Sequence, residues 1–105
     1  MFTQIITMKV PANSIQTLRT LITDEYLPEV QSRSGFVSAN LLEQVDDRNM
    51  THLIINWETQ SDVEAASHTS SLAGSPYSIV ARIPGMRVQR HSYLVTVTVE
   101  QVMPA

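Results

Sequence analysis

Residues 36–57 read FVSANLLEQVDDRNMTHLIINW, and this stretch decides the fold class. Its two ends, 36–45 and 51–57, are rich in the apolar, β-branched and aromatic residues that strands favour. Between them, the segment Asp46–Asn49 has the polar composition of a tight turn. The stretch therefore predicts a β-hairpin.

The sequence before the hairpin predicts one strand and one helix. Residues 2–10 alternate as a strand does, and the capping-box pair Asn13 and Gln16 should open a helix after it. Pro28 should kink this helix or end its regular part, and Gly35 closes the segment because it tolerates a positive φ. Apolar residues recur at helical spacing in between: Ile15, Leu18, Leu21, Ile22 and Tyr26.

The sequence after the hairpin predicts a second helix, a short third helix and a last strand. Ser61 and Glu64 form a second capping box, which opens a helix that runs to Gly74. A short helix is expected over 75–83, with serine and proline at its start. The last strand is predicted over His91–Val99, where apolar and polar residues alternate.

This order of elements predicts a single α+β domain over residues 1–105. Strand, helix, strand, strand, helix, strand is the βαββαβ order of a ferredoxin-like subunit with a four-stranded antiparallel sheet. A chain of 105 residues has the commonest size of one domain, so a second core is not expected.

The predicted strands are apolar on both faces, which predicts a partner for the sheet. Two helices can cover only one face, and a second copy of the sheet is the economical cover for the other. We therefore expect a homodimer joined sheet to sheet, with Ile54, Asn56 and the last strand in its interface. The apolar pairs that place one residue on each face are Ile5 with Ile6, Leu41 with Leu42, and Ile54 with Ile55.

The composition excludes several kinds of site. The chain has no cysteine, which removes disulfides, thiolate metal sites and cysteine nucleophiles. Its three histidines, His52, His68 and His91, are too far apart in sequence to suggest a metal site. The net charge of −3 argues against a nucleic-acid partner. Apolar runs no longer than three residues, and a start without a basic or apolar signal, predict no membrane span and a cytoplasmic location.

Charge is unevenly distributed along the chain. Residues 1–64 hold nine acidic and four basic residues, whereas residues 65–99 hold three arginines and no acid. This asymmetry leaves two interpretations open: complementary faces in an oligomer, or an attraction for an anionic ligand.

Three short motifs carry a resemblance to a known family. Ser34-Gly35-Phe36 precedes a strand, Asn56-Trp57-Glu58 ends the hairpin, and Ile83-Pro84-Gly85 precedes the last strand. With these motifs the chain resembles the antibiotic biosynthesis monooxygenase family, whose members are dimeric α+β barrels of ferredoxin-like subunits. The resemblance implies a cofactor-independent monooxygenase, in which molecular oxygen reacts with a small aromatic or quinol-type substrate that supplies its own electrons.

The resemblance places Trp57 at the wall of the substrate cavity, so we expect it to be a catalytic residue. A lone tryptophan at a strand end is equally understood as a core anchor. Quinol-oxidising relatives carry an asparagine four residues before that tryptophan, and here the position is Leu53, expected to line the substrate site. Because leucine donates no hydrogen bond, the alternative is a non-catalytic binding or structural dimer with the same fold.

Two further catalytic candidates, His52 and Asn56, lie on the same strand as Trp57 but should face the other side of the sheet. Asn56 could instead join a hydrogen-bond network across the barrel, and His52 would act as a base only if it reached the pocket. The second helix carries small inward residues and so should leave a pocket beside Ala66. Tyr77 at its mouth and a buried Tyr93 are expected to contact the substrate.

The haem-degrading branch of the same family uses an asparagine, a tryptophan and a histidine. A gap-free comparison places these at Gln4, near Ala66 and near Pro76. Two of the three are absent, which makes haem degradation the least favoured activity.

Overall fold

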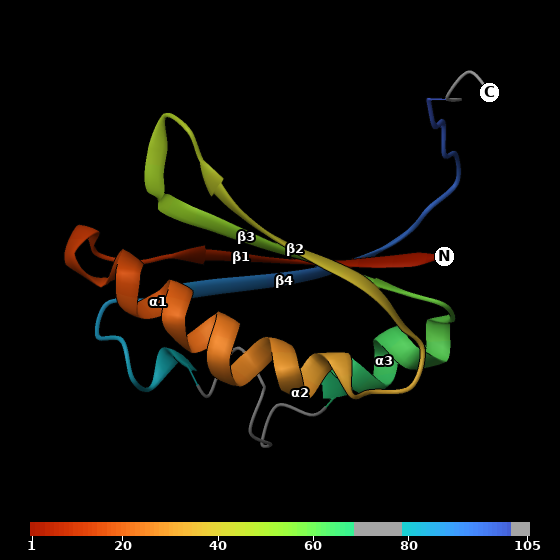
Figure 1. Cartoon of the computed structure of the whole chain (residues 1–105), viewed down its shortest axis with the longest axis horizontal. Helices are drawn as coiled ribbons and strands as arrows, with labels where there is room; N and C mark the ends of the chain where they lie inside the picture. Colours follow the sequence, from red (N-terminus) through yellow and green to blue (C-terminus); the bar gives the residue numbers. More distant parts are fainter. Residues whose placement is uncertain (69–78, 102–105) are drawn as a thin grey trace.

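The structure, a computed structural model, describes residues 1–68 and 79–101 (Figure 1). The strands and helices follow one another in the predicted order. They are β1 (Phe2–Lys9), a 3-10 turn (Ala12–Ser14), α1 (Ile15–Leu21), a π-helical turn (Ile22–Tyr26), α2 (Leu27–Gln31), β2 (Phe36–Gln44), β3 (Asp47–Trp57), α3 (Gln60–His68) and β4 (Arg87–Leu94).

The four strands form one antiparallel sheet in the order β2-β3-β1-β4. β1 lies in the centre, where Phe2 is opposite both Trp57 of β3 and Leu94 of β4. The predicted ferredoxin-like α+β fold is therefore confirmed.

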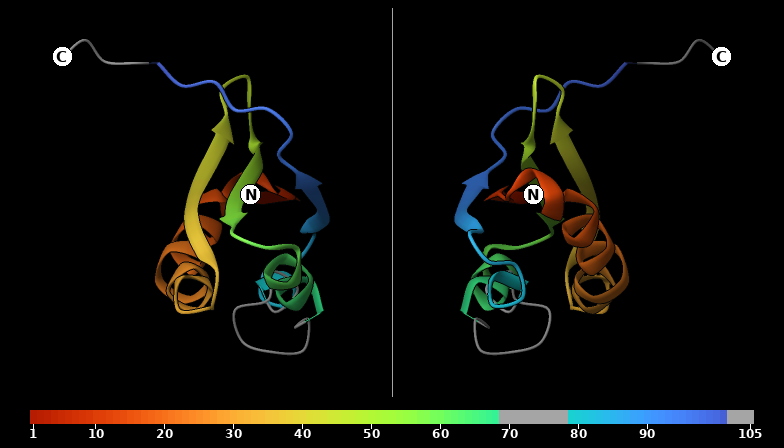
Figure 2. Two further views of the ribbon diagram at one scale, coloured as in Figure 1. Left: turned by 90° about the vertical axis from the view of Figure 1, so that its right-hand side faces the viewer. Right: turned by 90° about the vertical axis from the view of Figure 1, so that its left-hand side faces the viewer.

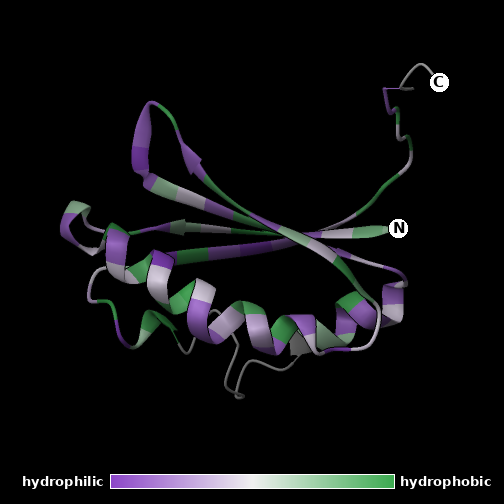
Figure 3. Ribbon diagram, viewed as in Figure 1, coloured by the Kyte–Doolittle hydropathy of each residue, from purple (hydrophilic) through white to green (hydrophobic). Residues whose placement is uncertain are grey.

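All helices lie on one side of the sheet, as Figures 1 and 2 show from three directions. The alternation expected for β1 is confirmed, because every second residue from Gln4 to Val10 is buried beneath the helices. Apolar and polar residues alternate along the helices (Figure 3), and the helix residues buried in the core include Leu18, Ile22 and Val30. The most deeply buried apolar side chains of this layer are Ile6, Met8, Leu18, Ile22, Leu53, Ile55, Trp57 and Ile83.

The first helical segment is interrupted as Pro28 predicts. α1 passes into the π-helical turn Ile22–Tyr26, and α2 continues from there with Pro28 in its first turn. A proline ring in a regular α-helix would collide with the carbonyl four residues earlier, and its nitrogen has no hydrogen to donate. The wider turn before Pro28 accommodates both effects.

Both predicted capping boxes are wrong. Asn13 lies inside the 3-10 turn, and α1 begins after Ser14 without a side-chain cap. At α3 the capping pair is Thr59 with Asp62: the Thr59 backbone N–H and hydroxyl donate to the Asp62 carboxylate at 3.2 and 2.8 Å. β3 ends at Trp57, as predicted, but the helix begins two residues earlier than expected, after Thr59 rather than after Ser61.

The last strand begins and ends earlier than predicted. β4 starts at Arg87, and its ladder ends where the Val95 N–H donates to the Met1 carbonyl at 3.1 Å. The neighbouring strand begins at Phe2, so residues after Val95 find no strand of this chain to pair with. Val97 and Val99 are consequently 77% and 89% exposed on a tail that leaves the sheet (Figure 1).

The hairpin turn is also shorter than predicted. β3 begins at Asp47, so the turn consists of Val45 and Asp46, and a register shift follows Glu43.

None of the helices in the described ranges has the length and apolarity to cross a membrane. Ile79 and Ile83 are buried as expected for the short third helix, whereas its predicted start over 75–78, and the end of the second helix to Gly74, lie outside the described residues.

Candidate functional site

A pocket of about 360 Å³ opens between the end of the sheet, α2 and α3. The sheet contributes Trp57, and the loop before β2 contributes Ser34. The two helical segments contribute both charged and small side chains, so the wall is mixed in character. The described residues that line it are Glu29, Arg33, Ser34, Trp57, Asp62, Ala65 and Ala66.

Trp57 closes the inner wall of this pocket. It is the last residue of β3 and is 1% exposed. Phe36 packs edge-on against the indole, with ring centroids 6.1 Å apart and planes at 83°. The indole Nε1 is buried and has no hydrogen-bond partner within residues 1–68 and 79–101, which leaves a donor available to a bound molecule.

Gln4 is a second buried polar side chain on the same face. It is 1% exposed, and neither its amide nitrogen nor its amide oxygen has a hydrogen-bond partner. Since Gln4 is opposite Ile55 and Phe2 is opposite Trp57, Gln4 and Trp57 are diagonal neighbours on adjacent strands. Burying such a group without a partner costs about 1–3 kcal/mol. The sequence signal for this group was a glutamine on the same side of the alternating stretch 2–10 as Ile6, and no contact of Gln4 with a quinol substrate was predicted from it.

The side of the pocket nearest α2 carries an ion pair. Arg33 lines it and forms a salt bridge of 3.2 Å with Glu29. Close by, burial raises the pKa of Tyr26 to about 12, against the opposing effect of the Arg33 and Arg90 charges. The guanidinium groups of Arg33 and Arg90 are therefore both close enough to the Tyr26 hydroxyl to lower its pKa.

The floor of the pocket is fixed by a close backbone approach. Gly35 has a left-handed φ of +81°, and its carbonyl accepts the Glu58 N–H at 2.9 Å. The carboxylate of Asp62 packs directly against the Gly35 α-carbon while it caps α3. This contact joins the start of β2 to the first turn of α3.

The predicted site residues separate into two groups. Trp57 and Ala66 meet in the pocket, as expected. Leu53 faces the same side of the sheet, but it is 1% exposed within the apolar core. Tyr77 lies outside the described residues.

His52, Asn56 and Tyr93 lie on the opposite face of the sheet, away from Trp57. The expected facing of His52 and Asn56 is confirmed, since they pair with Thr7 and Thr3 across β1 and β3. The Thr3 hydroxyl donates to Asn56 at 2.6 Å, Asn56 donates to Ser38 at 3.0 Å, and His52 Nδ1 lies 3.2 Å from the Thr7 hydroxyl.

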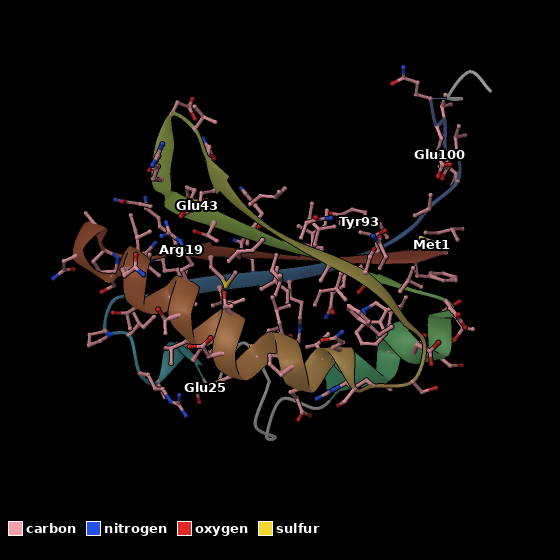
Figure 4. The ribbon with its side chains drawn as sticks, in the orientation of Figure 1. Met1, Arg19, Glu25, Glu43, Tyr93 and Glu100 are labelled. Atoms are coloured by element: carbon pink, nitrogen blue, oxygen red, sulfur yellow. The ribbon has the colours of Figure 1, made fainter. Side chains whose placement is uncertain are left out.

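The prediction that Tyr93 is buried is wrong. Tyr93 is 50% exposed, because β4 is an edge strand and no helix covers this face (Figure 4). Tyr93 packs at a tilt against His91, with ring centroids 6.4 Å apart. The uncovered face thus carries polar rows and apolar side chains rather than the pocket.

Over residues 1–68 and 79–101, no three acidic or histidine side chains are arranged to hold a metal ion.

A family model described as antibiotic biosynthesis monooxygenase matches residues 1–73. The chain belongs to the antibiotic biosynthesis monooxygenase family. A comparison with curated protein sequences gives no match.

Solved structures share the fold of this antibiotic biosynthesis monooxygenase family member. SnoaB, a cofactor-independent oxygenase from Streptomyces nogalater, superposes with a TM-score of 0.76 at 15% identity, covering 95% of this chain and 97% of that chain. A dimeric ferredoxin-like protein from an uncultured marine organism gives 0.76 at 6% identity, covering 96% and 100%. The heme-degrader MhuD from Mycobacterium tuberculosis gives 0.67 at 19% identity, covering 95% and 100%.

Proposed function

We propose that this protein is a cofactor-independent monooxygenase that acts on a small aromatic, quinol-type substrate in the pocket beside Trp57. One observation carries the proposal: Trp57, which lines the pocket, and Gln4, its diagonal neighbour on the same sheet face, both bury polar groups that have no hydrogen-bond partner among the described residues. Natural interiors rarely leave such groups unpaired, so they indicate a ligand that bears oxygen atoms.

The reaction balances without a cofactor. A dihydroquinone with one ring C–H reacts with O₂ to give a hydroxyquinone and water. One oxygen atom forms the new carbon–oxygen bond, the other leaves as water, and the substrate supplies all the electrons.

In this proposal each residue contacts the substrate through a different chemical group. The indole N–H of Trp57 donates to a substrate oxygen, and Gln4 donates to or accepts from a second one. Arg33 is the cation in the pocket wall, and a substrate oxygen that takes the place of Glu29 beside it would be favoured in its deprotonated, more strongly reducing form. Burial of the reacting ring excludes water.

A homodimer forms part of the proposal. The face opposite the helices exposes Val37 and Leu42 at 41% and 44%, and it also carries the half-buried Ile5 and Ile54. A second copy joined sheet to sheet would cover these side chains and complete a dimeric α+β barrel. The dimeric ferredoxin-like protein with the same fold supports this arrangement.

The test is oxygen consumption with a panel of dihydroquinones. We expect turnover by the intact protein and a loss of at least tenfold in Trp57→Phe, which keeps an aromatic side chain but removes the N–H donor together with part of the ring volume. Thr20→Ala, at an exposed position of α1, is the matched control and should retain full activity. Absence of turnover with every quinol would reject the catalytic proposal.

A non-catalytic binding protein is the second candidate, and Leu53 favours it. This side chain is fully apolar and 1% exposed where quinol-oxidising relatives carry an asparagine. A quinol that binds and protects the protein against unfolding, without oxygen uptake, would support that function. Haem degradation is not proposed, because the described residues that line the pocket include no histidine.

A further inference from the structure

Three cations without ion-pair partners gather at the corner where β1 ends and β4 begins. All seven basic residues lie in the described ranges. Three of them form salt bridges, Arg19 with Glu43, Arg33 with Glu29, and Arg82 with Glu25 (Figure 4 labels the first pair and Glu25). Arg90 faces the interior beside Tyr26. The other three, which form no salt bridge in the described residues, are Lys9, Arg48 and Arg87.

Lys9 and Arg87 are brought together by the sheet itself. They are directly opposite each other in the antiparallel pair β1 and β4. Like charges at such positions repel and weaken a strand pair. Lys9 is also opposite Met50, so Arg48 follows two residues away on the same face of β3. The fold thus concentrates positive charge in a chain whose net charge is −3.

The same corner is hollowed. Lys9 and Arg87 line a depression of about 340 Å³ together with Asn49 and three residues of the adjoining turns. Gly85, one of these turn residues, has a φ of +83° and presents no side chain to the space. The other two are Val10 and Pro11.

The acidic residues nearest in sequence, Asp46 and Asp47, form hydrogen bonds with neutral donors. The Asp46 carboxylate accepts the side-chain amide of Gln44 at 2.8 Å. The Asp47 carboxylate accepts the backbone N–H of Asn49 at 3.2 Å. Neither carboxylate forms a salt bridge with a described cation.

We propose that this corner binds a phosphoryl group of a small molecule. A guanidinium offers a planar fork of donors, an ammonium offers a compact charge, and an amide offers a further donor. This donor set suits a phosphoryl group, which carries a charge of about −1.5 to −2 near neutral pH and accepts through three oxygens. Of the two interpretations of the charge asymmetry, the position of Arg87 favours the anionic ligand.

The site is separate from the pocket beside Trp57. Phe2 is opposite Trp57, and Lys9 lies seven residues further along β1. At about 3.3 Å per residue, the two sites are roughly 23 Å apart along the sheet. Occupancy of the phosphoryl site therefore does not depend on quinol chemistry in the pocket, and either proposal can fail alone.

Amide NMR titration of the full chain with inorganic phosphate, at constant ionic strength, tests the proposal. We expect saturable shifts at Val10, Asn49 and Gly85. The dissociation constant should rise at least tenfold in Lys9→Gln/Arg87→Gln. The control Arg19→Gln/Arg82→Gln loses the same charge from exposed sites and should stay within twofold of the unmodified protein.

Three results would overturn the proposal: no saturable shift, equal weakening in both double variants, or acetate binding as tightly as phosphate. Lys9→Gln/Arg87→Gln relieves a like-charge contact, so it should fold at least as well as the unmodified chain. Arg87→Lys keeps the charge and removes the fork, and an intermediate affinity in that variant would support a bidentate contact.

Discussion

Gly35 lies so close to the carboxylate of Asp62 that a β-carbon at position 35 would overlap it. Gly35→Ala should therefore lower stability through two effects. An alanine would have to adopt the left-handed conformation, and its β-carbon would displace the Asp62 carboxylate that caps α3. The two effects are worth about 1–2 and about 1 kcal/mol, so we expect the free energy of unfolding to fall by about 2–3 kcal/mol in urea titrations.

Gly85 provides the matched control. Its φ of +83° is almost the same, but a β-carbon there would lie 3.4 Å from Pro11 Cγ, a contact that needs little rearrangement. Gly85→Ala should lose only about 1–2 kcal/mol, the cost of the left-handed conformation. Equal losses in the two variants would mean that the contact between Gly35 and Asp62 adds nothing.

Gln4→Met should separate stability from function. Methionine has nearly the same shape but no amide, so removal of a buried unpaired group should raise the free energy of unfolding by about 1 kcal/mol. If Gln4 binds a substrate oxygen, ligand affinity and oxygen uptake should both fall at least tenfold. A variant that is less stable yet fully active would show that the amide serves the fold.

The alternation of residues along the sequence correctly predicted which side of the sheet each strand residue faces. Alternation placed Gln4 and Ile6 beneath the helices and separated Asn56 from Trp57, and these facings hold. A strand end, in contrast, depends on its neighbour. Val97 belongs to the best alternation in the chain, but it lies beyond Phe2, where the antiparallel β1 begins, and so has no residue of β1 opposite it.

The pocket was predictable only in outline. Small residues such as Ala66 indicated that α3 leaves space, but which polar groups would remain unpaired there depends on contacts between distant segments. Thr59 with Asp62 has the same spacing as Ser61 with Glu64, and the sequence does not show that the Asp62 carboxylate also packs against the distant Gly35.

Tyr26 should make stability fall in alkali. Its pKa is raised to about 12 by burial, whereas an unfolded tyrosine titrates near 10. Between these pH values the unfolded chain loses a proton that the folded chain keeps, so the free energy of unfolding falls as pH rises, by about 2–3 kcal/mol in total. Tyr26→Phe should show a shallower decline from pH 10 to 12, and an identical slope would contradict the assignment.

Ile54→Glu should dissociate the proposed dimer. Ile54 lies in the centre of the face without helices, opposite Ile5 and Asn40 on its two neighbouring strands. Two symmetry-related carboxylates buried there would lack partners, at a cost of about 3 kcal/mol or more, so the dimer dissociation constant should rise at least 100-fold. Thr20→Glu adds the same charge on the exposed side of α1 and should leave association unchanged. Sedimentation equilibrium distinguishes these outcomes, and a stable monomer of the unmodified protein at micromolar concentration would reject the sheet-to-sheet dimer itself.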